Sequence, residues 1–365
     1  MTNRMKGVSF IIPVYNSAEF LPDCINELLQ PKVLDYEIIL VDDGSQDKSG
    51  SICDFYARNN SNIKVYHQAN RGVSAARNYG LKIAVKDFII FLDADDIVEI
   101  EKIEDAINIM TNNDAVDLLI FGMSFDYYAN GKMYRQDNMY YPYEGMLSIE
   151  QWINNLYELY INNSISSLCN KVFRKDIITA NNLVLNNQMF LYEDLEFVVQ
   201  YMSCCTDIYT SKEIIYHYRQ TENEGNLRRR LMRIEHVTQI ISPIEKAFSK
   251  IESLKQCNKE CRLQINHILV HLSLVLAEGK IACSNVRELI KLCEDMNQWL
   301  SNKYLEVDKI FSERRIKYLD AIKNKKIVWL IVDKRLMTIR RFLALRVKRT
   351  KFYKVVSTKV LGKEP

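Results

Sequence analysis

Short runs of aliphatic and β-branched residues alternate with amphipathic segments along the first third of the chain. The apolar runs predict buried β-strands at residues 8–12, 37–41, 63–67, 87–92 and 116–121. The segments between them have helical periodicity and predict helices at residues 19–30, 48–59, 74–85 and 101–111. Strands that alternate with helices in this way favour an α/β fold with a doubly wound, mostly parallel, Rossmann-like sheet.

The pattern changes in the second part of the chain. Residues 123–145 are rich in Tyr, Asn and Gly, which predicts a hairpin or an irregular excursion. Residues 208–219 predict two short strands. Further helices are predicted at residues 151–160 and 193–203. Beyond residue 234 every segment has helical periodicity, so we expect an α/β domain over residues 1–225 and an α-helical region over residues 226–365.

The composition indicates an ordinary globular protein, since 48% of the 365 residues are hydrophobic and 26% are charged. The apolar runs are too short to span a membrane, and the N-terminus lacks the small-residue cleavage site of a secretory signal. The nine cysteines include no CxxC pair, which favours free thiols in a reducing compartment. We therefore expect a cytoplasmic protein.

The net charge of +3 conceals a strongly basic segment near the C-terminus. Residues 321–354 carry twelve Lys or Arg and one acid, with apolar residues at helical intervals. A basic amphipathic helix of this kind favours peripheral attachment to an anionic membrane surface, at the inner face of the cell membrane. The alternative is a solvated helix that closes a bundle, and the C-terminal helices could also form a homodimer. No motif that reads nucleic acid accompanies the charge, so no nucleic-acid partner is expected.

Polar residues gather where the predicted parallel strands end, which is where open α/β sheets bind ligands. The candidate residues are Pro13, Tyr15 and Asn16 after the first strand, Asp42 and Asp43 after the second, Asn70 and Arg77 after the third, and Asp93 and Asp95 after the fourth. Acids this dense repel one another unless a cation or hydrogen-bond donors compensate them. The sequence therefore predicts a functional site at this edge of the sheet.

The fourth strand ends in an Asp-x-Asp motif, Asp93 and Asp95. Two carboxylates two residues apart can reach one Mn²⁺ or Mg²⁺ ion, which also takes phosphate oxygens and water as ligands. The alternative is that these acids only cap a helix. Neither a GxGxxG nor a GxxxxGK[ST] motif is present, which argues against a dinucleotide-binding or P-loop enzyme.

Several motifs together resemble the family 2 glycosyltransferases of the GT-A fold. The stretches IIPVYN, VDDGSQDKS, NRGVSAARNYG and FLDADD occur in the order and spacing of that family, and CNKVFR, YEDLEF and YHYR extend the likeness to about residue 220. The pattern is similar to bacterial enzymes that build capsular, exopolysaccharide or cell-envelope glycans. The resemblance implies a GT-A domain over residues 1–225, with a nucleotide half at 1–122 and an acceptor half at 123–225.

The resemblance also implies roles for the residues at the donor site. Asp42 or Asp43 would accept a hydrogen bond from the uracil N3–H, and Arg77 would lie near the diphosphate. Asp93 would contact the ribose or a metal-bound water, and Asp95 would ligate the metal ion. The rest of the nucleotide pocket would be formed by Pro13, Tyr15, Asn16 and Asn70.

Other residues would serve the acceptor side. Asp194 is expected to be the general base, with Glu193 as the alternative. Lys171 and Arg219 would contact the diphosphate or the acceptor. His217 would be a further metal ligand, or would simply pack within its strand.

These roles predict an inverting, metal-dependent enzyme that moves a sugar from a nucleotide sugar, expected to be a UDP-sugar, to a glycan hydroxyl. The expected acceptor is a lipid-linked glycan of a bacterial surface polysaccharide. The alternative is a catalytically silent scaffold that binds a nucleotide sugar at the membrane.

Overall fold

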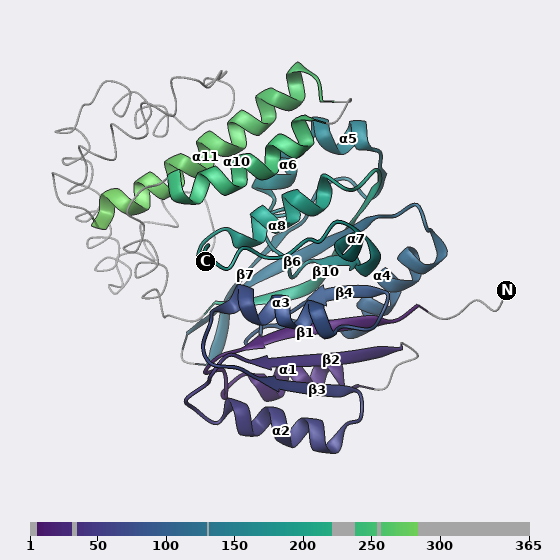
Figure 1. The fold of residues 1–365 in the computed structure, drawn as a ribbon, viewed down its shortest axis with the longest axis vertical. Helices are drawn as coiled ribbons and strands as arrows, with labels where there is room; N and C mark the ends of the chain where they lie inside the picture. The colour runs from purple at the N-terminus through teal and green to yellow at the C-terminus, as the bar shows by residue number, and fades with distance from the viewer. Residues whose placement is uncertain (1–5, 31–34, 130, 221–237, 254–256, 284–365) are drawn as a thin grey trace, which may run out of the picture. The chain divides into compact units, whose positions relative to one another are not determined.

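The computed structural model describes residues 6–30, 35–129, 131–220, 238–253 and 257–283 (Figure 1). The predicted domain boundary near residue 225, most of the helical C-terminal region and the basic segment 321–354 lie outside these residues. The chain divides into two compact units. The first contains the described residues up to 220 together with 240–253 and 257–269, and the second contains 238–239 and 270–283.

The first unit is built on one mixed sheet, whose main strand order is β3-β2-β1-β4-β9-β6-β10-β5. Its nucleotide-side strands are parallel to one another: β1 (Val8–Val14), β2 (Tyr36–Asp42), β3 (Ile63–His67) and β4 (Phe88–Phe91). The remaining strands are β5 (Ile97–Val98), β6 (Leu118–Ala129), β7 (Lys132–Met139), β8 (Gly145–Leu147), β9 (Lys171–Arg174) and β10 (Ile208–Gln220). The predicted α/β fold with a mostly parallel sheet is confirmed.

The strand directions place several chain segments at one edge of the sheet. Strand β9 runs antiparallel to both β4 and β6, so β6 is parallel to β4. Strand β10 is parallel to β6. The carboxyl ends of β1, β2, β4, β6 and β10 therefore point to the same edge.

Helices join and cover the strands. In the first half they are α1 (Leu21–Leu28), α2 (Ser49–Asn59), α3 (Val73–Ile83) and α4 (Ile100–Asn112). In the second half they are α5 (Ile149–Asn154), α6 (Leu156–Ile161), α7 (Lys175–Ala180), α8 (Glu193–Met202), α10 (Thr238–Glu252) and α11 (Lys259–Cys283). No helix among the described residues is both long enough and apolar enough to cross a membrane.

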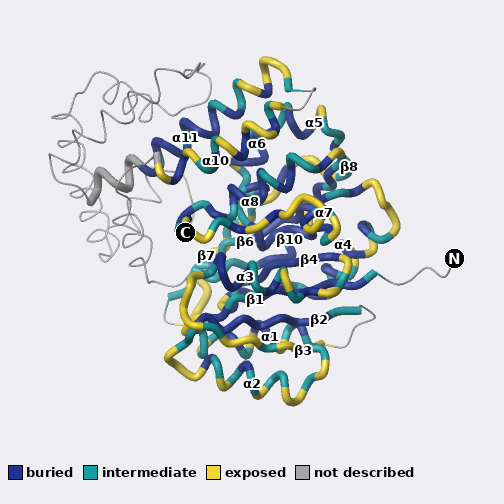
Figure 2. The backbone as a smooth tube through the Cα atoms, in the orientation of Figure 1, coloured by how far each residue is buried: buried dark blue, intermediate teal, exposed yellow. Residues whose placement is uncertain are grey.

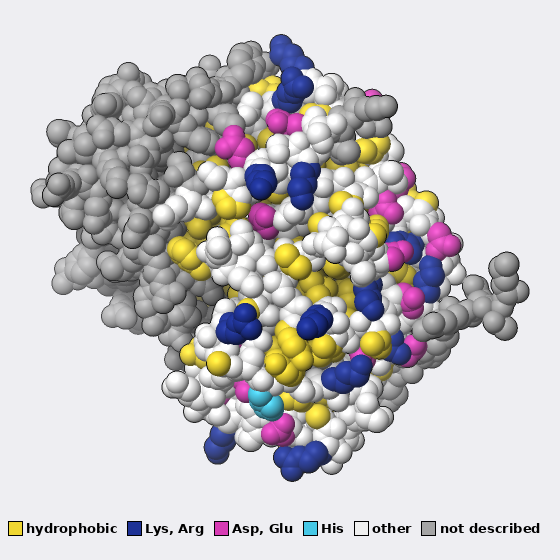
Figure 3. All heavy atoms as spheres, in the orientation of Figure 1, with side chains coloured by type: hydrophobic (Ala, Val, Ile, Leu, Met, Phe, Trp, Pro, Cys, Tyr) yellow, Lys and Arg dark blue, Asp and Glu magenta, His cyan; other side chains and the backbone are white. Residues whose placement is uncertain are grey.

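The core lies on both faces of the central strands, which Figure 2 shows as buried along most of their length. This double-sided burial explains why the strands read as continuous apolar runs. Helix α3 approaches β1 closely at Gly80, where a Cβ atom would collide with the side chain of Ile11. That close contact fixes the position of Arg77, one turn earlier on α3. On the face drawn in Figure 3, acidic and basic side chains are interspersed over the described surface.

Two local predictions are corrected by the structure. The two short strands expected within 208–219 form one strand, β10, whose pairing with β6 shifts register between Thr210 and Tyr216. Bulges of this kind interrupt the alternation of side chains without ending the strand. The helix expected at 151–160 is divided at Asn155, whose side-chain amide donates to the carbonyl of Gln151. Strand β9 has no counterpart among the predicted strands.

Candidate active site

Arg77 connects two parts of the predicted site that are far apart in sequence. Its guanidinium donates through Nη2 to Asp93 Oδ1 at 2.7 Å and through Nη1 to Asp194 Oδ1 at 2.8 Å. The side chain is almost fully buried, and its Nε has no hydrogen-bond partner among the described residues. The Asp-x-Asp motif and the predicted base are thus held by one cation.

Asp194 lies in the first turn of α8, and the residue that precedes this helix has an unusual backbone conformation. Tyr192 precedes the helix with φ of 62°, in the left-handed region that non-glycine residues rarely adopt. Burial raises the pKa of Asp194, the positive charge of Arg77 opposes this rise, and the charge of Asp93 adds to it. Glu193, the alternative base, is buried beside it. A carboxylate with a raised pKa is suited to accept a proton near neutral pH.

Asp95 is exposed, unlike the neighbouring Asp96. Partial desolvation by the surrounding chain and the charge of Asp93 raise the pKa of Asp95, while Arg219 lowers it. A divalent cation between Asp93 and Asp95 would relieve this repulsion, so the two residues fit such an ion. The described residues contain no group of three or more metal-ligating side chains. Divalent cations of this kind also take substrate oxygens and water as ligands.

Asp96 has a structural role that the sequence did not reveal. It is 1% exposed, accepts a hydrogen bond from the Tyr216 hydroxyl, and accepts another from the Arg219 backbone N–H at 2.7 Å. Burial, together with the charges of Asp93 and Asp95, raises its pKa well above the ordinary value. Asp96 thus joins the motif loop to β10. The only signal in the sequence was its place directly after Asp95.

The two acids after β2 are both engaged in holding loops. Asp43 accepts hydrogen bonds from the side chain of Gln68 at 2.7 Å and from the backbone N–H groups of Arg71 and Gly72 at 2.8 Å. It therefore shapes the loop that leads into α3.

Asp42 is held in a similar way by residues after β2 and at the end of β3. It accepts from the Ser45 backbone N–H at 3.0 Å and lies 2.8 Å from His67 Nδ1. Burial opposes its ionisation, but these hydrogen bonds prevail and lower its pKa. Asp42 is thus ionised at neutral pH, as its predicted contact with an imide N–H requires.

The other predicted nucleotide contacts lie on neighbouring loops. Asn16 has φ of 50° and accepts from the Gln46 backbone N–H at 2.8 Å, which joins the loop after β1 to the loop after β2. Gly44 has φ of 73°, and a Cβ atom there would lie 2.8 Å from the backbone nitrogen of Asn70. Tyr15 is half exposed and Pro13 is partly buried. The structure thus brings these residues together at one end of the parallel strands.

Lys171 occupies a different setting from the one predicted. Its side chain is fully buried, and its ammonium group donates to the Ser167 carbonyl and to Asn170 Oδ1. Burial lowers the pKa of Lys171 to about 7, against the opposing influence of Asp194. Because protein oxygens already bind this group, the structure does not support a direct contact of Lys171 with the diphosphate or acceptor.

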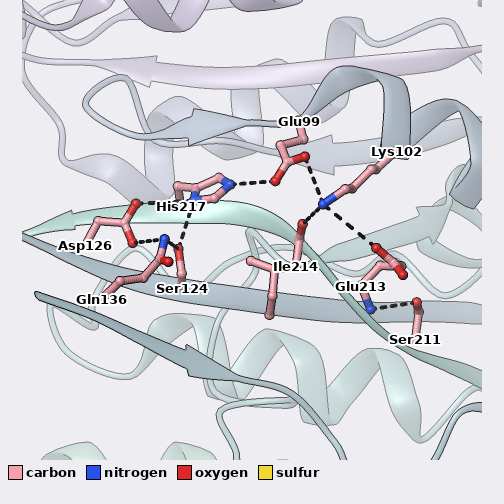
Figure 4. A network of polar contacts seen from close by, with 9 residues as sticks. All are labelled: Glu99, Lys102, Ser124, Asp126, Gln136, Ser211, Glu213, Ile214 and His217. Atoms are coloured by element: carbon pink, nitrogen blue, oxygen red, sulfur yellow. Dashed lines mark hydrogen bonds and ion pairs between the residues drawn. The ribbon is translucent and has the colours of Figure 1, made fainter.

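His217 also has protein partners on both ring nitrogens (Figure 4). Its Nδ1 lies 2.9 Å from Ser124 Oγ and 3.2 Å from Asp126 Oδ2, and its Nε2 lies 3.0 Å from Glu99 Oε1. Gln136 of β7 joins the same network by donating to Asp126 at 2.9 Å. The geometry favours the packing alternative for His217 over the metal-ligand prediction.

Arg219 lies near the Asp-x-Asp motif. Its guanidinium carbon is 4.8 Å from the ring centre of Phe20 and 5.9 Å from that of Tyr128. Its charge lowers the pKa of Asp95. Its Nε is buried without a hydrogen-bond partner among the described residues. Its Nη1 lies 3.7 Å from Asp23 Oδ2. A largely covered cation with an unused donor beside the motif is suited to an anionic group.

Comparison with known proteins agrees with the motifs. Residues 9–180 match the model of glycosyl transferase family 2. Putative glycosyltransferase EpsH of Bacillus subtilis is 31% identical over 215 residues, which are 58% of this chain and 60% of EpsH. Minor teichoic acid biosynthesis protein GgaB of the same species is 30% identical over 220 residues, 59% of this chain and 23% of GgaB. The chain spans between about a quarter and three fifths of the curated relatives it matches first.

A solved structure shares the fold. TarS residues 1–349 of S. aureus, in complex with UDP-GlcNAc, superimpose with a TM-score of 0.65 at 19% identity, over 90% of this chain and 92% of that one. At this identity the likeness establishes the fold alone. The GT-A fold expected from the motifs is therefore confirmed.

Proposed function

We propose that the chain, whose residues 9–180 match the model of glycosyl transferase family 2, is a member of that family and transfers a sugar from a nucleotide-sugar donor to a hydroxyl group of a glycan. The observation that carries this proposal is the position of Arg77, which holds Asp93 and Asp194 at 2.7 and 2.8 Å. This arrangement places the predicted donor motif and the predicted base on either side of one guanidinium. A sugar bound over this guanidinium would have its leaving group on the side of Asp93 and its acceptor on the side of Asp194.

The donor is proposed to be a UDP-sugar that binds over the ends of β1, β2 and β4. The solved TarS complex contains UDP-GlcNAc, which supports uracil as the nucleobase of the donor. Asp42, or its neighbour Asp43, would accept from the uracil. Arg77 would lie near the diphosphate, and Arg219 would contact the diphosphate or the acceptor. Asp93 and Asp95 would hold Mn²⁺ or Mg²⁺, which supplies charge neutralisation for the departing diphosphate.

Asp194 is proposed to act as the general base, with Glu193 as the alternative. Its carboxylate takes the proton of the acceptor hydroxyl as the hydroxyl oxygen bonds to the anomeric carbon. The bond between that carbon and the diphosphate oxygen breaks with its electron pair leaving on the nucleoside diphosphate. Attack from the face opposite the leaving group inverts the anomeric configuration.

The acceptor is proposed to be a lipid-linked glycan of a bacterial surface polymer, bound by the acceptor half at 123–225. The name of GgaB, which refers to teichoic acid biosynthesis, supports this polymer class. The basic segment 321–354 supports peripheral attachment at the inner membrane face, and salt-sensitive binding to anionic vesicles is its test. A homodimer through the C-terminal helices remains a prediction from sequence.

The transfer reaction tests this function directly. UDP release is measured from UDP-GlcNAc, UDP-glucose and UDP-galactose, with Mn²⁺ and a bacterial glycolipid extract as acceptor. The wild type is expected to consume one donor, and Asp194→Asn to lower the rate by roughly 10²- to 10⁴-fold, the usual contribution of a general base. Asp105→Asn makes the same chemical change on the exposed face of α4 and should leave the rate unchanged.

Two outcomes would oppose the proposal. A normal rate in Asp194→Asn would show that the base is wrongly assigned. Consumption of no donor by the folded wild type would favour the catalytically silent scaffold.

A further inference from the structure

The hairpin formed by β6 and β7 carries aromatic side chains that are not buried in the core. Tyr134 of β7 is 67% exposed, and its ring centre lies 6.3 Å from that of Tyr127 on β6. The guanidinium of Arg135 lies 5.0 Å from the same Tyr127 ring. We call these three residues, Tyr127, Tyr134 and Arg135, the hairpin platform.

The hairpin platform is held in place by polar contacts at its base and beside it. Arg135 is fixed by an ion pair with Asp137 at 2.5 Å. Gln136 donates to Asp126 at 2.9 Å, and through Asp126 the hairpin joins the His217 network of Figure 4. These contacts connect the base of the hairpin platform to the rest of the sheet.

The hairpin platform lies at the same edge of the sheet as the candidate active site. Tyr127 is near the carboxyl end of β6, and β1, β2 and β4 end at this edge too. Tyr128, the next residue of β6, lies 5.9 Å from the guanidinium carbon of Arg219 and points to the other face of the sheet. The platform and the candidate site therefore share one edge of the sheet.

The side chains of the hairpin favour one class of occupant. A pyranose ring has an apolar face of C–H groups that packs on an aromatic ring, and hydroxyl groups that pair with planar polar side chains. Exposed rings and the side chains of Arg135 and Asp137 provide both kinds of contact. Addition of a further strand is disfavoured, because β7 is charged and its pairing with β6 is irregular at Tyr127.

We propose that the hairpin platform is a binding subsite for the glycan chain of the acceptor, beyond the sugar that reacts. This inference rests on the proposed glycosyl transfer, because it assumes that the acceptor is a glycan. It locates the acceptor on residues for which the motifs gave no role.

Binding to arrayed glycans tests the hairpin platform. The probes are hexose oligosaccharides, N-acetylhexosamine oligosaccharides and bacterial capsular polysaccharides. The wild type is expected to bind at least one class, and Tyr134→Ala to weaken that binding at least tenfold. Tyr134→Phe keeps the ring and should retain the binding. Phe55→Ala removes an equally exposed ring from α2, 61% exposed, and should have no effect.

Titration with UDP separates this inference from the proposed function. UDP binding should be the same in Tyr134→Ala and the wild type, whereas loss of UDP binding from all variants would oppose the proposed function alone. The hairpin inference is overturned if the wild type binds no arrayed glycan, or if Tyr134→Ala binds as the wild type does. It is also overturned if Tyr134→Ala alters only vesicle binding or the molar mass in solution, since those results assign the rings to a membrane or to a second copy.

Discussion

At the scale of single residues, the buried guanidinium of Arg77 determines the electrostatics of the candidate site. One cation there faces two carboxylates, Asp93 and Asp194, and its pKa lies well above the ordinary value because their charges outweigh the effect of burial. The sequence predicted that Arg77 and Asp93 would lie at the same edge of the sheet, since both follow parallel strands. It did not predict the contact with Asp194, because 117 residues separate the two and no periodicity connects them.

The pH dependence of transfer is expected to depend on the positive charge of Arg77. Because Asp194 must be ionised to act as a base, activity should fall as the pH drops through its raised pKa. Arg77→Gln removes the charge that opposes this rise, so the acidic limb of kcat/KM should move to higher pH. Each unit of movement lowers the rate on that limb about tenfold.

The control for this prediction keeps the charge. Arg77→Lys should move the limb less than Arg77→Gln, while Arg71→Lys on the exposed loop before α3 should leave it in place. The profile is measured as kcat/KM across pH 5 to 8, with the midpoint of urea unfolding as the check on folding. An acidic limb at the same pH in Arg77→Gln would contradict the assigned role.

At the scale of elements, α8 concentrates acids in its first turn and buries them. The helix N-terminus favours ionised carboxylates, yet burial prevails at Glu196, which is 7% exposed, and raises its pKa to about 7. Helix periodicity predicted α8 to within one residue at its end. The same pattern could not show which of the acids would be covered, since that depends on the packing of distant segments. The prediction of two short strands where β10 forms one was wrong for a related reason. A bulge interrupts the alternation of side chains in the sequence, as the end of a strand does.

Glu196 should make stability depend on pH. Its pKa is near 7 in the folded protein and 4.5 as its ordinary value, so the folded state binds more protons between these limits. Wild-type stability should therefore fall as the pH rises from 5 to 7, by up to about 1.4 kcal/mol per pH unit. Glu196→Gln lacks the titrating group and should not show this loss.

Urea unfolding at several pH values measures the difference between the two proteins. Glu101→Gln, an exposed acid in the first turn of α4, is the matched control and should follow the wild type. Parallel stability curves for the wild type and Glu196→Gln would show that Glu196 keeps its ordinary pKa.

At the scale of the whole molecule, strand direction explains how the site is assembled. Parallel strands β1, β2 and β4 bring the donor residues to one edge, and β6 and β10 extend the same edge to the hairpin platform and Arg219. The alternation of strands and helices was sufficient to predict this edge. The antiparallel strand β9 was not predicted, although it joins the two halves of the sheet.

Nucleotide binding tests the central claim, that this edge is a nucleotide-sugar site. Titration calorimetry with UDP, GDP and dTDP, each with and without Mn²⁺, measures it in the wild type, Asp95→Asn and Asp105→Asn. We predict that UDP binds in a metal-dependent manner, that Asp95→Asn weakens this binding at least tenfold, and that Asp105→Asn does not. Failure of the folded wild type to bind any of the three, or unchanged binding in Asp95→Asn, would contradict the claim.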